Sequence, residues 1–117
     1  MAEPAVQVIN REGIKIARLI NIPEFNLFSM NKIKQQLQEA IAERPEKIII
    51  DLCNVDYIDS SGIGTLIAIR RNVTAYKGSF YITGLNFAVS QVFAHTKLDQ
   101  LFKILPSVED AIDSTGL

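Results

Sequence analysis

The chain has 117 residues, of which 48% are hydrophobic and 21% charged, and its formal net charge is −1. This length suits one domain over residues 1–117, with an ordered core of about 5–113, and excludes two separate cores. A near-neutral charge also excludes the basic excess of a protein that grips a nucleic-acid backbone, so we expect no direct nucleic-acid partner.

The composition also bears on location and redox chemistry. The first residues carry neither a basic region nor a long apolar segment, and no later stretch approaches the ~20 apolar residues of a membrane span. We therefore expect a cytoplasmic protein with no membrane partner. Cys53 is the single cysteine, which excludes an intrachain disulfide, and its place at the end of a predicted central strand favours a buried, apolar role.

The first part of the chain predicts a hairpin and a helix. Residues 6–8 and 14–20 are strand-like, and the turn residues 10–13 between them predict an antiparallel edge hairpin. Asn26 or Ser29 can then cap a helix. The apolar positions of that helix form a single stripe, made of Met30, Ile33, Leu37, Ala40 and Ile41.

The rest of the chain alternates strands with helices. Lys47–Cys53 is an apolar run rich in isoleucine, which is typical of a strand covered on both faces. The elements predicted after it are a helix over residues 61–76, a strand over 79–83, a helix that turns Val89, Val92 and Phe93 inward, a short strand over 102–105, a small helix that buries Ala111 and Ile112, and a loose tail over 114–117. This order indicates right-handed crossovers and parallel neighbours. We expect an α/β fold in which a mixed β-sheet with an edge hairpin carries about four helices, packed chiefly on one face.

The start of the second helix carries the candidate functional residues. Asp59, Ser60 and Ser61 are typical helix caps, but a helix N-terminus is also a favourable place for a phosphate. At helical spacing Ser61 shares a face with small or uncharged residues, which predicts a flat surface that a partner can approach closely. The residues of this face and beside it are Thr65, Ala68, Asn72, Gly62 and Gly64.

These residues belong to a longer run that resembles a known family. The run over residues 48–67, IIIDLCNVDYIDSSGIGTLI, resembles the signature of STAS domains, most closely that of the bacterial anti-sigma factor antagonists. In that signature a hydrophobic strand leads into Asp-Ser-Ser-Gly-hydrophobic-Gly. Ile22–Asn26 occupies the place of the family's Gly-Glu-Leu-Asp, and Lys97–Ile104 is similar to its Gly-Leu-x-x-x-Phe-x-Ile segment. The resemblance covers most of the chain and implies the STAS fold.

The resemblance implies a partner switch. The unmodified antagonist binds an anti-sigma factor that is also an ATP-dependent serine kinase, and this binding releases a sigma factor. The phosphorylated residue of the family is the second hydroxyl of the motif, which is Ser61 here, with Ser60 as the fallback; a separate serine phosphatase of the PPM type resets the system. A phosphate would add about 1.5–2 negative charges beside Asp56 and Asp59, so we expect it to stop binding without unfolding the helix.

One departure from the family lies before the first helix. The antagonists usually carry an aspartate where this chain has Asn26, which keeps the hydrogen-bonding shape and loses a charge. In the family this aspartate contributes to the kinase contact or the phosphorylation site. Asn26 therefore belongs to the expected partner-binding residues and leaves the efficiency of phosphorylation open.

Other chemistry has simpler explanations. A hydrolase would need a base, and the only histidine, His95, stands near the end of the third predicted helix, where it suits the helix dipole. Asp56 and Asp59 could gather magnesium around a phosphorylated serine, but a turn residue and a cap are the simpler roles. Arg70 and Arg71 could meet acidic groups on a partner or face solvent. Walker and dinucleotide motifs are absent from the sequence, so we expect no enzyme, no metal and no cofactor.

Two rival functions stay open. The chain could be an interaction-only STAS domain, a scaffold or transport-system subunit that keeps Asp-Ser-Ser-Gly as a cap and is never phosphorylated. It could also be a nucleotide or anion sensor that uses the start of the second helix as its binding site.

Overall fold

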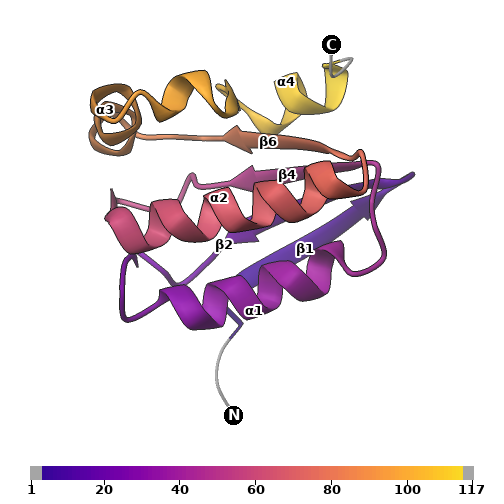
Figure 1. Cartoon of the computed structure of the whole chain (residues 1–117), viewed down its shortest axis with the longest axis horizontal. Helices are drawn as coiled ribbons and strands as arrows, with labels where there is room; N and C mark the ends of the chain where they lie inside the picture. The colour runs from indigo at the N-terminus through magenta and orange to yellow at the C-terminus, as the bar shows by residue number, and fades with distance from the viewer. Residues whose placement is uncertain (1–3, 115–117) are drawn as a thin grey trace.

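A five-stranded mixed β-sheet organises residues 4–114, the part of the chain that the computed structural model describes (Figure 1). In spatial order its strands are β1 (Val6–Arg11), β2 (Ile14–Leu19), β4 (Lys47–Asp51), β6 (Ser79–Thr83) and β7 (Lys103–Leu105). β1 pairs antiparallel with β2, and the other neighbours are parallel.

The opening hairpin is confirmed, with a tighter turn than the sequence predicts. Asn10 and Arg11 belong to β1, so only Glu12 and Gly13 connect the strands. Both have positive φ, 46° and 86°, as a two-residue hairpin turn with the correct twist requires.

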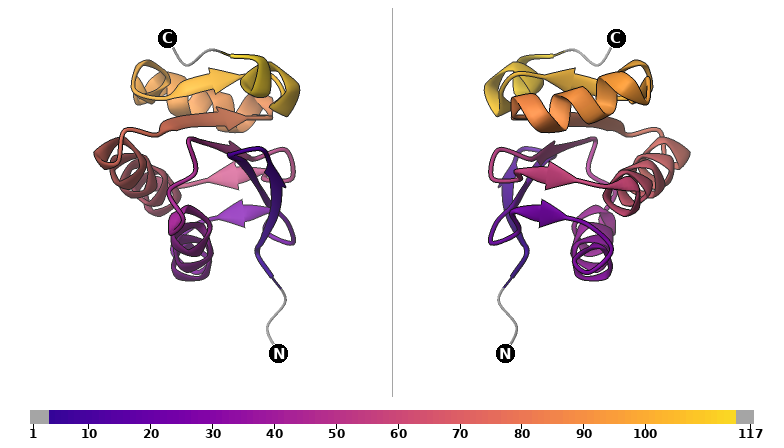
Figure 2. Two further views of the ribbon diagram at one scale, coloured as in Figure 1. Left: turned by 90° about the vertical axis from the view of Figure 1, so that its right-hand side faces the viewer. Right: turned by 90° about the vertical axis from the view of Figure 1, so that its left-hand side faces the viewer.

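The helices cover mainly one face of the sheet, as the sequence predicts (Figure 2). They are α1 (Met30–Ile41), α2 (Ser60–Ala75), α3 (Phe87–His95), a short 3-10 helix η1 (Leu98–Gln100) and α4 (Val108–Asp113). The first three pack on the main core, while α4 closes a smaller cluster on the opposite face. Ile48, Ile49 and Ile50 of β4 are all fully buried, which confirms the strand covered on both faces.

Lys47 fastens α4 to the far face of the sheet. Its Nζ donates hydrogen bonds to the carbonyls of Ala111 at 2.8 Å and Ser114 at 2.6 Å, and the hydroxyls of Tyr81 and Ser114 are 2.9 Å apart. The expected loose tail is therefore wrong at Ser114, which is held, and residues 115–117 lie outside the described residues.

The central strand is shorter than predicted, and this changes the place of Cys53. β4 ends at Asp51, where the chain leaves the sheet. Cys53 therefore lies beyond the layers that cover the strand and is exposed, so the predicted buried role is wrong. Partial desolvation of the thiol and the neighbouring Asp51 carboxylate raise the pKa of Cys53, which keeps the thiol protonated at neutral pH.

Two very short strands, absent from the sequence prediction, form a separate parallel pair at the end of the main sheet. They are β3 (Glu24–Phe25) and β5 (Tyr57–Ile58). β3 lies in the segment that precedes α1, and β5 lies in the segment that precedes α2. Their pairing therefore places these two segments side by side.

None of the helices in the described range is both long enough and apolar enough to span a membrane.

Candidate phosphorylation and partner-binding site

The start of α2 lies at the carboxyl end of the central strand, held by the short β3–β5 pair. The amides of Asp56 and Tyr57 both donate to the carbonyl of Pro23, at 2.7 and 3.1 Å, and the Asp59 amide donates to the carbonyl of Phe25 at 3.1 Å. These bonds run between segments more than thirty residues apart in sequence. They fix the start of α2 against the segment that leads into α1.

Asp51 anchors the loop that leads toward this site. Its buried carboxylate accepts hydrogen bonds from Arg18 Nε at 2.8 Å and from the Cys53 amide at 3.1 Å. The bond with Asp51 raises the pKa of the Arg18 guanidinium, which stays charged. Gly84 passes so close that a Cβ there would lie 2.5 Å from Asp51 Oδ1. The exit from β4 is thus tied down before the chain reaches α2.

Asp59 is the N-cap of α2, as predicted. Its backbone is extended, with φ −112° and ψ −174°, and its Oδ1 accepts hydrogen bonds from the amides of Ser61 at 2.9 Å and Gly62 at 3.1 Å. Ser60 is the first helical residue and is exposed, while Ser61 is half-exposed. The Asp59 carboxylate therefore accepts hydrogen bonds from two of the amides that have no partner within the helix, and both serine side chains stay partly exposed to solvent.

Gly62 has a packing role instead of the predicted place on a partner-binding surface. It is buried, and a Cβ on it would lie 2.5 Å from the carbonyl oxygen of Phe25 and 2.7 Å from Cγ1 of Ile58. Gly64 is different, because it is exposed and a Cβ there would meet nothing within 4 Å. Of the two glycines, only Gly64 stays in the predicted surface.

The predicted helical face beyond Ser61 is only partly accessible. Thr65 is 2% exposed, and its hydroxyl donates to the carbonyl of Ser61 at 3.0 Å, so it cannot contact a partner directly. Ala68 is half-exposed and Asn72 is exposed. The surface therefore consists of separate positions along α2, because Thr65 turns toward the interior.

Asn26 builds the turn that begins α1. Its side-chain Oδ1 accepts hydrogen bonds from the backbone amides of Phe28 at 3.0 Å and Ser29 at 3.2 Å. Its backbone amide donates to Ser29 Oγ at 3.0 Å. Ser29 holds the N-cap position but makes no side-chain cap bond, so Asn26 supplies the capping interactions of this turn. Because the β3–β5 pair joins the segments that lead into α1 and α2, the structure brings Asn26 to the same end of the sheet as Ser61.

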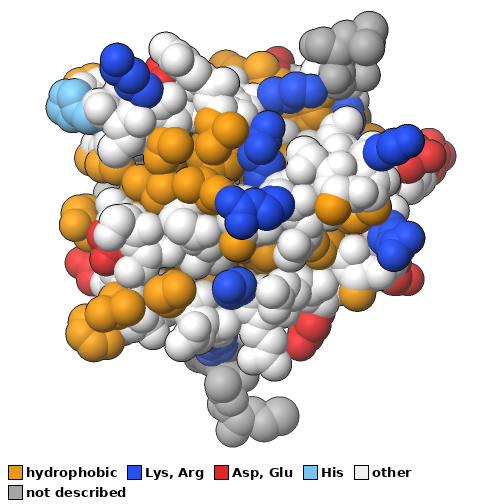
Figure 3. Space-filling model, viewed as in Figure 1, with side chains coloured by type: hydrophobic (Ala, Val, Ile, Leu, Met, Phe, Trp, Pro, Cys, Tyr) orange, Lys and Arg blue, Asp and Glu red, His pale blue; other side chains and the backbone are white. Residues whose placement is uncertain are grey.

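Four large exposed apolar side chains, which the sequence analysis missed, lie at the same end of the sheet. Figure 3 shows hydrophobic side chains gathered at the end where α1 and α2 begin. We call these four residues the apolar collar: Leu27 is 61% exposed, Phe28 93%, Tyr57 50% and Phe87 79%. Their only signal in the sequence is that bulky apolar residues stand in loops and at helix starts, outside any helical stripe. Apolar groups gathered in this way on a surface indicate a protein-binding site.

Other candidate residues lie apart from this site. His95 is exposed at the last position of α3. Arg71 is exposed and Arg70 half-exposed, further along α2. Asp56 is exposed, and within residues 4–114 no cluster of three or more His, Cys, Asp or Glu side chains suits a metal ion.

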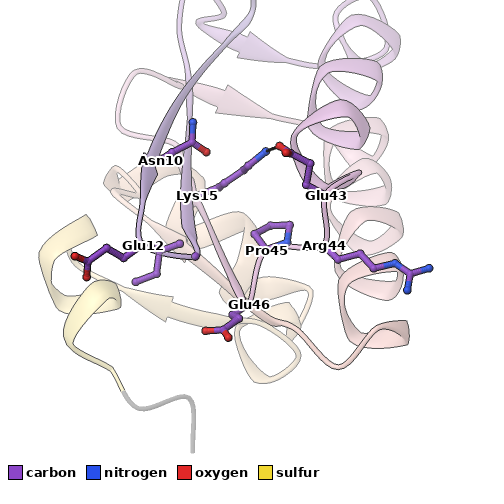
Figure 4. Close-up of a pocket in the computed structure, with 9 residues that line it drawn as sticks. Asn10, Glu12, Lys15, Glu43, Arg44, Pro45 and Glu46 are labelled. Carbon is purple, nitrogen blue, oxygen red and sulfur yellow. Dashed lines mark hydrogen bonds and ion pairs between the residues drawn. The ribbon is translucent and has the colours of Figure 1, made fainter.

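A hollow of about 330 Å³ lies at the opposite end of the sheet, between the hairpin turn and the segment that links α1 to β4 (Figure 4). Lys15 points across it and pairs with Glu43 at 2.7 Å, while Arg44 points away. The bond from Lys15 lowers the pKa of the Glu43 carboxyl. This hollow adjoins the start of β4, so it is separate from the site at Ser61.

The fold and the helix start together define a small α/β domain with a capped, serine-bearing helix start at the carboxyl end of its central strand. The STAS domain model matches residues 5–111, and the chain belongs to this family. It is 27% identical to the anti-sigma F factor antagonist of Paenibacillus polymyxa over 112 residues, which span 93% of this chain and 90% of that protein.

Several solved structures share the fold, and two of them illustrate the likeness. The crystal structure of an anti-sigma factor antagonist from Mycobacterium paratuberculosis aligns with a TM-score of 0.82 at 22% identity, over 96% of both chains. The phosphorylated form of the Bacillus cell fate determinant SpoIIAA aligns with a TM-score of 0.67 at 22% identity, over 93% of this chain and 97% of that one. At these identities the likeness concerns the fold alone.

Proposed function

We propose that this protein is an anti-sigma factor antagonist whose binding surface is switched by phosphorylation of Ser61. The observation that carries the proposal is the placement of a half-exposed serine at the start of α2, at the same end of the sheet as the apolar collar. The relative from Paenibacillus polymyxa is named an anti-sigma F factor antagonist, which supports the general role.

In the unmodified state the collar supplies the affinity. Phe28 and Phe87 offer large apolar areas that lose contact with water when a partner docks, and aromatic side chains are common anchors of protein interfaces. The partner in this proposal is an anti-sigma factor with serine kinase activity. Docking would bring the ATP of the anti-sigma factor to Ser61. It would also cover the surface with which the anti-sigma factor otherwise holds the sigma factor.

Phosphorylation ends the interaction through charge. A phosphate on Ser61 adds about 1.5–2 negative charges next to Asp59, whose carboxylate already accepts a hydrogen bond from the Ser61 amide. The added charge must then be desolvated against the apolar collar when the partner docks, which opposes binding. The capped helix itself need not change, because its backbone bonds do not involve the serine hydroxyl. A PPM-type serine phosphatase would restore the binding state.

The same geometry weighs against an anion sensor. An anion at the start of α2 would need the free amides of Ser61 and Gly62, but Asp59 already accepts hydrogen bonds from both. The scaffold alternative keeps one supporting observation, since Asn26 is neutral and serves the turn before α1.

Incubation with the cognate kinase and ATP tests the proposal. We expect one phosphate on Ser61 by peptide mass spectrometry, lost in Ser61→Ala and kept in Ser60→Ala, together with loss of the stable complex. Stable binding without phosphate transfer would support the scaffold instead. Phosphate on Ser60 alone would move the switch to the neighbouring residue.

A further inference from the structure

We propose that the exposed edge of β1 pairs with β1 of a second copy of this chain, so that two sheets join into one across a two-fold axis at Val8. β1 is the outer strand of the sheet, with β2 on one side and no strand on the other among residues 4–114. An edge strand presents unpaired backbone groups, and proteins usually protect it from association.

β1 has little of the usual protection, since only its Val6 amide is covered, by Gln36 of α1. Its ladder with β2 runs without a break from Val6 to Arg11, so no bulge bends it away. Residues 6–10 include no charge, proline or glycine. Val8 and Ile9 project large aliphatic side chains on opposite faces, 38% and 37% exposed. The edge is therefore regular, neutral and partly apolar, which are the features that favour strand pairing.

The backbone pattern selects one register for a second copy. The Ile20 amide donates to the Ala5 carbonyl at 2.8 Å, so the alternating residues that include Ala5 turn their polar groups toward β2. Val6, Val8 and Asn10 then turn theirs outward. The Val6 amide is already bonded to Gln36 Oε1 at 2.8 Å, which leaves its carbonyl and the groups of Val8 and Asn10 for a partner strand.

A two-fold axis at Val8 pairs all of these groups except the Asn10 carbonyl, which lies opposite the Val6 amide that Gln36 already binds. Each Val8 donates to and accepts from Val8 of the other copy, and each Asn10 amide donates to the other Val6 carbonyl. Ile9 faces Gln7 on the opposite side of the sheet, so no like charges meet along the paired stretch. A second copy fits because each free donor of this stretch, the amides of Val8 and Asn10, then meets a free acceptor of the other copy.

This dimer leaves the candidate site open. Ser61 lies at the carboxyl end of the parallel strands, beyond β4, while β1 is two strands away at the edge. A dimer would therefore present two copies of the apolar collar at once. The inference stands independently of the phosphorylation switch.

Sedimentation of the unaltered chain over a dilution series provides the first test. We expect a monomer–dimer equilibrium, and we expect Val8→Lys to raise the dissociation constant about tenfold because two lysines then face each other. Leu101→Lys is the matched control, since Leu101 is also 38% exposed but lies elsewhere. A chain that stays monomeric contradicts the inference, even if its β1 edge pairs with a strand of another protein. A dimer whose dissociation constant is unchanged in Val8→Lys also contradicts it.

Disulfide trapping then tests the register in a Cys53→Ser background. Residues directly opposite in a hydrogen-bonded antiparallel pair have Cα atoms about 5.5 Å apart, within the range of a disulfide. Val8→Cys should cross-link to a covalent dimer under mild oxidation, while Asn10→Cys, which faces Val6 of the other copy, should not. Equal cross-linking of both variants, or of neither, would overturn the two-fold axis at Val8.

Discussion

The Asp59 carboxylate accepts a hydrogen bond from the Ser61 amide at 2.9 Å, so the residue proposed as the switch is held by the cap of its own helix. The bond fixes the backbone of Ser61 while its side chain stays half-exposed. Stability and regulation therefore depend on different atoms of the same residue, and they can be tested separately.

Removal of the cap should lower stability without direct damage to the proposed docking surface. Asp59→Ala leaves the amides of Ser61 and Gly62 without their acceptor, and loss of such a cap costs about 1 kcal/mol. Urea unfolding measures the change as a lower midpoint at unchanged slope. Asp59→Asn, which keeps an acceptor, is the control and should retain most of the stability. Equal loss in both variants would show that the charge, and not the cap bond, matters.

The two glycines of α2 should respond in opposite directions to alanine. In Gly62→Ala the new Cβ would press on the Phe25 carbonyl, so we expect destabilisation of about 1–3 kcal/mol. In Gly64→Ala the Cβ enters open space, and the better helix propensity of alanine should stabilise the domain by about 0.5–1 kcal/mol. Thermal or urea unfolding compares the two variants directly. A tolerated Gly62→Ala would contradict the close packing of β3 on α2.

The apolar collar should matter for binding and little for stability. Phe28 is 93% exposed, so Phe28→Ser should unfold within about 0.5 kcal/mol of the unaltered chain. If Phe28 anchors the partner, affinity for the anti-sigma factor should fall about thirtyfold, which corresponds to about 2 kcal/mol. Leu101→Ser removes an exposed apolar residue outside the collar and serves as the control in the same calorimetric titration. Equal affinities of the two variants would remove the collar from the interface.

The ion pair between Lys15 and Glu43 predicts a pH effect. The pKa of the Glu43 carboxyl is lowered in the folded state, so the pair stabilises the fold above the unfolded-state pKa of glutamate. This contribution is lost as the pH falls through the lowered folded-state pKa. Glu43 is exposed, so the effect on stability should be small. An NMR titration should give Glu43 a lower pKa than a free glutamate, and Lys15→Met should abolish the difference.

Much of the fold could be predicted because it follows from periodic patterns. The isoleucines of β4 form an unbroken apolar run, and the stripe of α1 repeats at helical spacing, so both elements and their burial agree with the sequence. The end of β4 could not be placed, since Leu52 and Cys53 continue the apolar pattern past the point where the chain leaves the sheet. The wrong prediction of a buried Cys53 follows from that misplaced strand end.

The candidate site was predicted in part. The cap at Asp59 follows from local chemistry and is confirmed. The burial of Gly62 depends on its neighbours Phe25 of β3 and Ile58 of β5, and strands of two residues have no periodicity to reveal them. Thr65 is buried as well, although helical spacing places it on the same face as Ser61. Exposed Phe28 lies in a loop, where the sequence gives residue type but not orientation. Helical spacing thus identifies a face of α2 but not what packs against it.

The most direct test of the account compares the affinity of the cognate anti-sigma factor for the unaltered chain, Ser61→Ala and Ser61→Asp. We expect Ser61→Ala to bind about as tightly as the unaltered chain, since it removes only a hydroxyl. We expect Ser61→Asp to bind at least about tenfold more weakly, because a charge enters the docking surface. Binding of Ser61→Asp with unaltered affinity would contradict the proposed switch.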